Sequence, residues 1–162
     1  MDLIEFWRNR TKEDYTANKK FVAKLAKSKN KKLNAFADDL HEKVFREIDC
    51  LDCGNCCRRI PPILNETDVK RAAKFLGLKP TVFKGQYVRI DEDQDMVINA
   101  SPCPFLESDN KCEIYDARPR ACREYPHTDN YEFLKHTRLH LPNSEHCPAV
   151  FHILKKMRED IS

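Results

Sequence analysis

The sequence predicts an α+β fold that is rich in helix, with a small β-hairpin and a loop-rich core of cysteines. Apolar residues recur every three or four positions over much of residues 1–49 and again over 150–157, which is the spacing of a buried helix face. Two short runs of β-branched and aromatic residues, 87–90 and 96–98, flank an acidic turn and predict the hairpin. The length of 162 residues is typical of one domain.

We expect this single domain, residues 1–162, to contain three segments. They are a basic N-terminal helical segment (1–49), a cysteine-cluster core (50–126) and a C-terminal loop and helix (127–162). In the first segment one apolar face runs from Leu33 to Ile48, and a shorter one runs from Phe21 to Leu25. The polar run 28–32 separates them, so a two-helix hairpin and one long helix both fit, and we favour two helices.

Positive charge is concentrated in residues 8–32, which hold ten lysines and arginines against two acidic residues. Such a run is more often a solvated helix face than a nucleic-acid site, and no glycine–aromatic or base-reading pattern accompanies it here. We therefore expect a solvated face, with a nucleic-acid-binding zinc module as the less favoured interpretation.

Further helices are expected after the first cysteines. Asn65 or Thr67 can cap a helix that runs through Phe75, and Gly77 suits the position that follows its last turn. Pro80 suits the first turn of a short second helix, because proline needs no amide hydrogen there.

Half of the eight cysteines fall within eight residues, as Cys50, Cys53, Cys56 and Cys57. Thiolate is the softest ligand that a side chain offers, and it is the choice for zinc, copper(I) and iron–sulfur clusters. Two-residue spacers let successive sulfurs converge on one ion or cluster, and Gly54 supplies the freedom for a tight turn. The spacing predicts a metal site.

The other four cysteines are Cys103, Cys112, Cys122 and Cys147, each in a short irregular stretch beside proline or a turn. A purely structural cysteine usually lies within a helix or strand face, so this placement favours a role as ligand for these four as well. We therefore include all eight cysteines in the expected ligand set.

The adjacent Cys56 and Cys57 favour two sites over one. Side chains of neighbouring residues point apart, which makes it awkward for both to bind one metal ion. One arrangement combines Cys50, Cys53 and Cys56 with one remote cysteine and leaves Cys57 to join the remaining three.

The kind of metal stays open at this point. The spacing of Cys50, Cys53 and Cys56 matches the bacterial ferredoxin run, whose partner cysteine is followed by proline, as Cys103 and Cys147 are here. The same spacing suits zinc, which four thiolates enclose in a tetrahedral structural site. We expect zinc or an iron–sulfur cluster.

Histidines are the main competing ligands. His136 and His140 stand four positions apart, as on one helix face, yet they lack a carboxylate partner at a useful spacing. We favour the cysteines.

The eight cysteines would also suit the disulfide scaffold of a small secreted protein. The first residues, however, lack a basic lead followed by an apolar stretch, and no apolar run approaches the roughly 18 residues of a membrane helix. We expect a cytoplasmic protein with no membrane span, in which the thiols stay reduced.

Three blocks of sequence resemble the YkgJ-like cysteine-cluster family, a zinc- or iron-chelating domain with a CxxCxxCC signature. The run Cys50-x-x-Cys53-Gly-x-Cys56-Cys57-Arg58 is similar to its opening signature. The middle and closing blocks are similar at Cys103-Pro-Phe-Leu with Lys111-Cys112-Glu-Ile-Tyr115, and at residues 116–126. The resemblance implies a metal-binding module, with metal ions as its first partners and a protein partner as a further option.

Arg118 and Arg123 lie inside the closing block, and we expect them beside the thiolates. Four thiolates on Zn²⁺ carry a net negative charge that guanidinium groups would offset. Ordinary surface pairing with Asp116 or Glu124 is the alternative.

The cysteine region also resembles, more distantly, that of flagellin lysine N-methylases, which use S-adenosylmethionine. This resemblance implies a cluster-dependent enzyme as an alternative function. The chain has three glycines and no glycine-rich strand-to-helix turn of the kind that binds nucleotide-like cofactors. We therefore expect a metal-binding cysteine-cluster protein.

Overall fold

The computed structural model describes residues 1–161, which fold into two compact units. The first unit combines residues 1–49 with the segment from Pro126 onward, and the second comprises residues 50–125. The structure is helix-rich with one two-stranded antiparallel sheet, so the predicted α+β class is confirmed. Each unit is described by itself.

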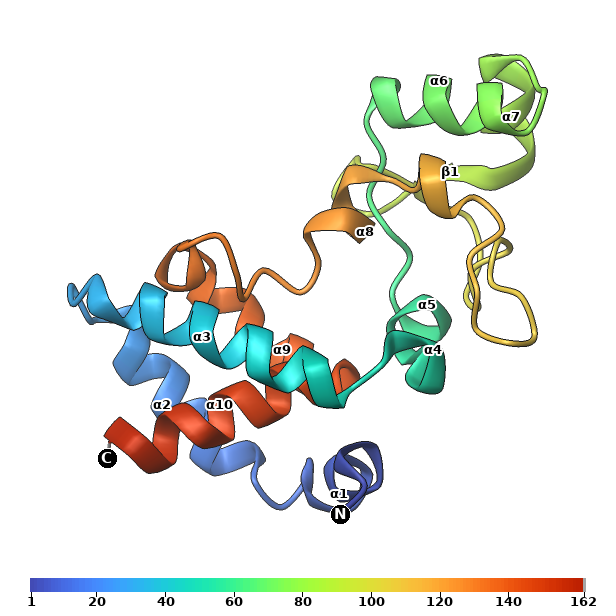
Figure 1. Cartoon of the computed structure of the whole chain (residues 1–162). Coiled ribbons are helices and arrows are strands. Elements are labelled where there is room, and N and C mark those ends of the chain that lie inside the picture. Colours follow the sequence, from blue (N-terminus) through green and yellow to red (C-terminus); the bar gives the residue numbers. More distant parts are fainter. Residues whose placement is uncertain (162) are drawn as a thin grey trace. The chain divides into compact units, whose positions relative to one another are not determined.

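The first unit is helical throughout (Figure 1). Its elements are α1 (Leu3–Arg10), α2 (Tyr15–Ala26), α3 (Lys32–Glu47), the 3-10 helix η2 (Phe133–His136), α9 (Thr137–His146) and α10 (Pro148–Ile161). Helix α10 packs against α9, α3 and α1, and α2 packs against α9.

The predicted break between two N-terminal helices is confirmed, since α2 ends at Ala26 and α3 begins at Lys32. The structure adds a further helix, α1, before them. The chain turns between α1 and α2, where the buried carboxylate of Asp14 accepts hydrogen bonds from Arg10 and Arg158, at 3.0 and 3.2 Å.

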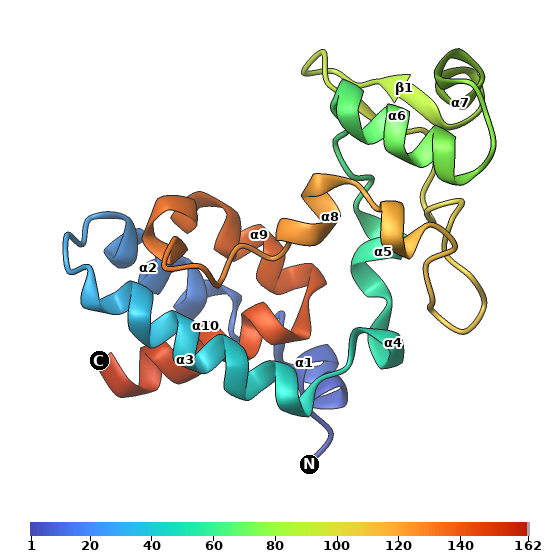
Figure 2. The ribbon, with the colours of Figure 1, turned by 45° about the horizontal axis from the view of Figure 1, so that its top comes forward.

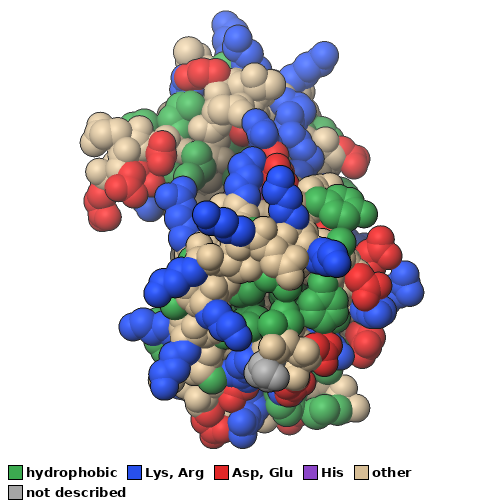
Figure 3. Space-filling model, turned by 90° about the vertical axis from the view of Figure 1, so that its left-hand side faces the viewer, with side chains coloured by type: hydrophobic (Ala, Val, Ile, Leu, Met, Phe, Trp, Pro, Cys, Tyr) green, Lys and Arg blue, Asp and Glu red, His purple; other side chains and the backbone are tan. Residues whose placement is uncertain are grey.

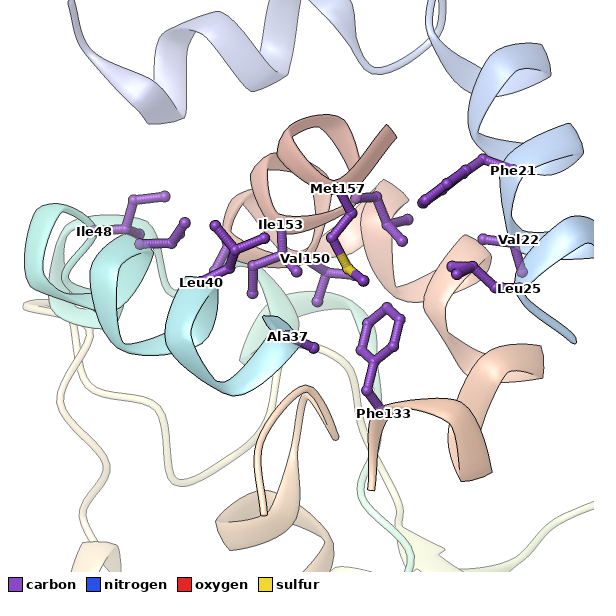
Figure 4. Packing of buried hydrophobic residues seen from close by; sticks show 13 residues of the cluster. Phe21, Val22, Leu25, Ala37, Leu40, Ile48, Phe133, Val150, Ile153 and Met157 are labelled. Atoms are coloured by element: carbon purple, nitrogen blue, oxygen red, sulfur yellow. The ribbon is translucent and has the colours of Figure 1, made fainter. Parts of the chain in front are cut away.

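The core of this unit lies between α2, α3 and α10 (Figure 4). Phe21, Val22 and Leu25 point inward from α2, as their spacing predicts. The closing helix α10 is the most deeply buried element, and Val150 and Met157 are completely buried. The predicted apolar face of the C-terminal helix is therefore confirmed.

The second unit holds short elements joined by loops. They are α4 (Cys50–Cys53), α5 (Asn55–Arg59), α6 (Glu66–Phe75), α7 (Pro80–Tyr87), β1 (Val88–Ile90), β2 (Met96–Ile98), the 3-10 helix η1 (Tyr115–Ala117) and α8 (Arg120–Glu124). Figures 1 and 2 both show α6 and α7 next to the hairpin.

Helix α6 has the predicted limits. The Asn65 side chain accepts a hydrogen bond from the Asp68 amide, and the Asp68 carboxylate accepts one from the Asn65 amide. This reciprocal pair is a capping box, which satisfies two amides that the first helical turn leaves without partners. Gly77 follows the helix with a φ of +70°, and Pro80 begins α7, both as predicted.

The hairpin pairs Val88 with Ile98 and Ile90 with Met96 in antiparallel register. Tyr87, expected in the first strand, is the last residue of α7 instead. A core cluster lies under the sheet and α6, and it includes Phe105 and Ile114 from the segment that bears the remote cysteines. The packing of these two residues fixes the cysteine loops against the unit.

Among residues 1–161, no helix combines the length and the apolar character that crossing a membrane requires.

Candidate metal centre

The first four cysteines lie on two short helical turns, α4 and α5, which Gly54 joins. Gly54 has a φ of +56°, in the left-handed region that glycine adopts without steric cost. A Cβ at this position would lie 2.7 Å from Nη1 of Arg58 and 2.7 Å from Oδ1 of Asn110. Glycine is thus required both by the backbone conformation and by the close approach of two side chains.

Arg58 and Asn110 hold the turn between α4 and α5. The Arg58 guanidinium donates from Nη1 to the carbonyl oxygen of Cys53 at 2.9 Å, and from Nη2 to Oδ1 of Asn110. The Asn110 amide donates in turn to the carbonyl oxygen of Leu51 at 2.7 Å. This network joins the first cysteine run to the loop that lies between Cys103 and Cys112.

Two backbone contacts bring the remote cysteines towards the first run. The amide of Cys103 donates to the carbonyl oxygen of Cys57 at 2.9 Å. Cys112 forms an isolated β-bridge with Leu106, and the amide of Glu113 donates to the carbonyl oxygen of Phe105 at 2.8 Å. The loop between Cys103 and Cys112 therefore doubles back, so that both cysteines come to the same part of the unit.

Cys122 is placed by α8, which follows Pro119. The buried carboxylate of Asp68 accepts hydrogen bonds from the Arg120 amide at 3.1 Å and from Nη2 of Arg71 at 3.0 Å. The same Nη2 donates to the carbonyl oxygen of Arg118 at 2.6 Å. Asp68 and Arg71 thereby attach the start of α8 to α6.

Three remote thiols of the second unit lie within the electrostatic range of Cys57. Burial raises the pKa of Cys103 and of Cys112, and the negative charge of a Cys57 thiolate raises both pKa values further. Although Cys122 is exposed as a residue, desolvation of its thiol raises its pKa to about 12, and charge on Cys57, Cys103 and Cys112 adds to the effect. These four cysteines are called the four-thiol group below.

Cys57 differs from the other members of this group. A hydrogen bond with the Cys56 side chain lowers the pKa of Cys57 to about 7, and the positive charge of Arg58 acts in the same direction against the desolvation of the thiol. Near neutral pH a large fraction of Cys57 is therefore thiolate, while its three neighbours keep their protons.

Arg118 acts electrostatically on two members of the four-thiol group. Its charge lowers the pKa values of Cys112 and Cys122 against the opposing effect of burial. The guanidinium group lies 3.9 Å from the centre of the Tyr115 ring and donates to the Tyr115 carbonyl oxygen at 3.1 Å. Arg123 contacts the backbone, donating to the carbonyl oxygen of Arg118 at 3.0 Å, and so supports the segment that carries Arg118.

The remaining four cysteines are divided between the two units. Cys50, Cys53 and Cys56 lie on α4 and α5, whereas Cys147 follows α9 in the first unit. The Cys147 amide closes that helix with a hydrogen bond of 2.8 Å to the carbonyl oxygen of Asn143. All eight cysteines are present as thiols, without disulfide bonds.

His140, one of the two competing histidine ligands, is part of the packed interior. The His140 ring is completely buried, stacks on Phe133 with 4.0 Å between ring centres, and donates from Nε2 to the Phe133 carbonyl oxygen at 2.7 Å. Burial lowers the pKa of His140 to about 4. This histidine therefore belongs to the core of the first unit.

The donor set of the four-thiol group fits a soft metal. Four sulfurs from four segments are in electrostatic range, with one of them partly ionised and an arginine beside them. Within residues 1–161, however, no three cysteine, histidine or acidic side chains stand in a ligating arrangement. Metal binding would therefore require both the loss of thiol protons and a closer approach of the sulfurs.

Residues 49–148 match the model of a family described as "CxxCxxCC: Putative zinc- or iron-chelating domain". The chain belongs to the CxxCxxCC family. No curated protein and no solved structure matches it. The matched region contains all eight cysteines, including Cys147, which lies outside the blocks that resemble the family in the sequence alone.

Asp68, Arg71 and Asn110 are site-building residues of this CxxCxxCC protein that sequence reasoning missed. The position of Asp68 three residues after the Asn65 cap is a signal for a capping box, which explains one of its two carboxylate oxygens. The other oxygen bonds to Arg120, 52 residues away, and nothing local in the sequence indicates this.

Proposed function

We propose that this CxxCxxCC protein binds zinc or an iron–sulfur cluster through its cysteine thiolates, and that the four-thiol group is one complete ligand set. The observation that carries the proposal is that Cys57 lies close enough to Cys103, Cys112 and Cys122 for its charge to raise the pKa of each, in a unit where the Cys103 amide donates to the Cys57 carbonyl oxygen. These thiols come from four separate segments of one compact unit. Burying the thiol groups costs free energy, and metal binding would offset that cost.

Metal binding at this group would serve mainly to stabilise the fold. Four thiolates would close the coordination shell of zinc and leave no position for a substrate, which is typical of structural sites. The bound metal would supply a positive centre that stabilises all four sulfurs as thiolates. Arg118 would then balance the excess negative charge, since its guanidinium group already favours ionisation of Cys112 and Cys122.

Cys57 is the member of the group that needs least change to hold a metal. Its pKa of about 7 makes it the thiol of the group that is most readily ionised. Because cysteine binds metal as the thiolate, Cys57 would hold the metal with the smallest cost of proton release among the four. The backbone contact between Cys57 and Cys103 keeps the second thiol-bearing segment within reach.

A second set of ligands is proposed from the first cysteine run. Cys50, Cys53 and Cys56 are carried by the turn that Arg58 and Asn110 hold in place. Cys147, in the first unit, is proposed separately as a metal ligand, because the family match extends over it. Thiol ligands alone suit both zinc and an iron–sulfur cluster, so chemical analysis decides between them.

The test is metal and acid-labile sulfide analysis of anaerobically purified chain, together with an absorption spectrum. A colourless protein with zinc and no sulfide would establish zinc, whereas brown colour with iron and sulfide in equal amounts would establish a cluster. Protein that contains neither metal after purification, and takes up neither on reconstitution, would overturn the proposal.

A further inference from the structure

Seven exposed lysines gather on α2, on the turn that follows it and at the first residue of α3. They are Lys19, Lys20, Lys24, Lys27, Lys29, Lys31 and Lys32, and they are called the lysine face below. Residues 16–37 contain no acidic residue at all. Figure 3 shows Lys and Arg side chains along one edge of the lower part of this view, with few acidic side chains among them.

The charge of the lysine face is uncompensated. Within residues 1–161 none of its seven ammonium groups takes part in an ion pair. Acidic residues on other helices of this unit are engaged locally: on α3 Asp39 pairs with Lys43 and Glu42 with Arg46, and on α10 Glu159 pairs with Lys155. A surface with this much unbalanced charge attracts anions strongly at low salt.

The lysine face is also held rigidly. The opposite side of α2 is buried through Phe21 and Leu25, which fixes the rotation of the helix. In the turn, Ser28 accepts a hydrogen bond from the Asn30 amide at 3.2 Å, and Asn30 accepts one from the Lys32 amide at 3.1 Å. These side chains order the turn, so its lysines extend the row on α2.

The spacing of the row suits a polyanion with closely spaced charges. Lys20, Lys24 and Lys27 recur at four and three residues, and so share one side of α2. At 1.5 Å per residue they span about 10 Å, which is the length over which a nucleic-acid duplex presents about six phosphates.

We propose that the lysine face binds the phosphate backbone of double-stranded nucleic acid without reading its sequence. A single strand is disfavoured because base stacking needs exposed aromatic side chains, and the large exposed hydrophobic residues all lie outside residues 16–37. The same absence leaves nothing to anchor the face in a bilayer. Protein interfaces favour aromatic residues and arginine and are depleted in lysine, the opposite of this composition.

The test is fluorescence anisotropy of a labelled 20-base-pair duplex titrated with the full chain at several salt concentrations. If all seven lysines contact phosphates, the logarithm of the affinity falls with the logarithm of salt concentration with a slope of about −6. The triple variant Lys20→Gln, Lys24→Gln, Lys27→Gln is expected to lose about 3 units of this slope and at least about tenfold in affinity at low salt.

A matched variant, Lys70→Gln, Lys74→Gln, Lys79→Gln, removes the same charge from exposed positions of the second unit. It is expected to bind within about twofold of the unmodified chain, because charges that do not contact the duplex release no counterions from it. Equal losses in both triple variants would overturn the proposal. So would an absence of salt-dependent duplex binding, or binding of the lysine face to phosphatidylserine vesicles alone.

This inference does not depend on the metal. Metal content is measured on the same preparations, and both triple variants are expected to match the unmodified chain, since all six substituted lysines are exposed and none is a neighbour of a cysteine in the sequence. A loss of duplex binding at constant metal content is therefore specific to the lysine face.

Discussion

The amide of Cys103 donates a hydrogen bond of 2.9 Å to the carbonyl oxygen of Cys57. The two residues are distant in sequence, yet this contact joins the first cysteine run to the segment that carries the remote cysteines. Cys56 and Cys57 have different surroundings. Cys57 acts electrostatically on three remote thiols, whereas Cys56 donates a hydrogen bond to Cys57. The two adjacent cysteines are therefore assigned to different ligand sets.

This assignment predicts which cysteine substitutions remove the same metal. Cys57→Ser and Cys112→Ser should each remove the metal of the four-thiol group, and the double variant should lose no more metal than either single one, because both residues serve one site. Cys56→Ser combined with Cys112→Ser should instead lose the sum of the two single losses. Metal per chain, measured by mass spectrometry of the acid-digested protein, checks both pairs. Additive losses for Cys57 with Cys112 would contradict the assignment.

Gly54 offers a test of the turn that carries the first cysteines. Gly54→Ala must strain the left-handed backbone, at about 1–3 kcal/mol, and must also displace Arg58 or Asn110. Gly77→Ala is a matched control, because Gly77 has a similar φ of +70° and nothing lies within 4 Å of an added Cβ. Denaturant titration should show a larger loss of unfolding free energy for Gly54→Ala, and only that variant should also bind metal more weakly. Equal losses and unchanged metal binding would show that the close packing around Gly54 is irrelevant.

Much of the fold follows from local patterns in the sequence. The capping box at Asn65, the glycine after α6 and the apolar face of α10 all act within a few residues, so they are visible in the chain itself. The turn between α1 and α2 was not predicted, because it involves Asp14 and Arg158, which are 144 positions apart.

The candidate site, too, can be predicted from the sequence only in part. Adjacent Cys56 and Cys57 predict two sites, because neighbouring side chains point apart. Which remote cysteines join Cys57 depends on how Phe105 and Ile114 pack in the core and on the reach of Asn110, and these are tertiary contacts that no spacing rule encodes. Local spacing therefore predicts the number of sites, whereas tertiary packing determines which cysteines belong to each.

Asp68 is predicted to control Cys122 from a distance. Asp68→Ala removes the acceptor for Arg120 and leaves the Arg71 guanidinium without its carboxylate, which should lower the unfolding free energy by about 3 kcal/mol. Asn65→Ala is the comparison, because it removes only the cap of the same helix and should cost about 1 kcal/mol. Metal dissociation, followed with a chromogenic chelator, should accelerate in Asp68→Ala and stay unchanged in Asn65→Ala. The same rate in both variants would limit Asp68 to the helix cap.

His140 predicts how stability depends on pH in the first unit. Burial first, and then the nearby His136 and His127, lower its pKa to about 4, against the opposing effect of the hydrogen bond to Phe133. Its Nδ1 atom is buried and has no hydrogen-bond partner among the described residues, so a proton there would be unsolvated.

The sign of the effect follows from comparing the two states. Above pH 6.5 the His140 ring is neutral in both the folded and the unfolded chain, and stability is at its full value. Between pH 6.5 and about 4 the unfolded chain takes up a proton that the folded chain refuses, so stability falls as the pH is lowered, and it levels off below about 4. The total loss is at most about 3 kcal/mol.

The variant His140→Phe keeps an aromatic ring against Phe133 and removes the titrating nitrogen. At pH 7.5 it should be less stable than the unmodified chain by about 1 kcal/mol, because the hydrogen bond to the Phe133 carbonyl is lost. On acidification this deficit should shrink and then reverse, since only the unmodified chain pays for excluding a proton from the site. Chemical denaturation of both proteins from pH 7.5 to pH 4.5, at equal metal content, measures the difference directly. Parallel stability curves over that range would show that His140 does not carry the pH dependence.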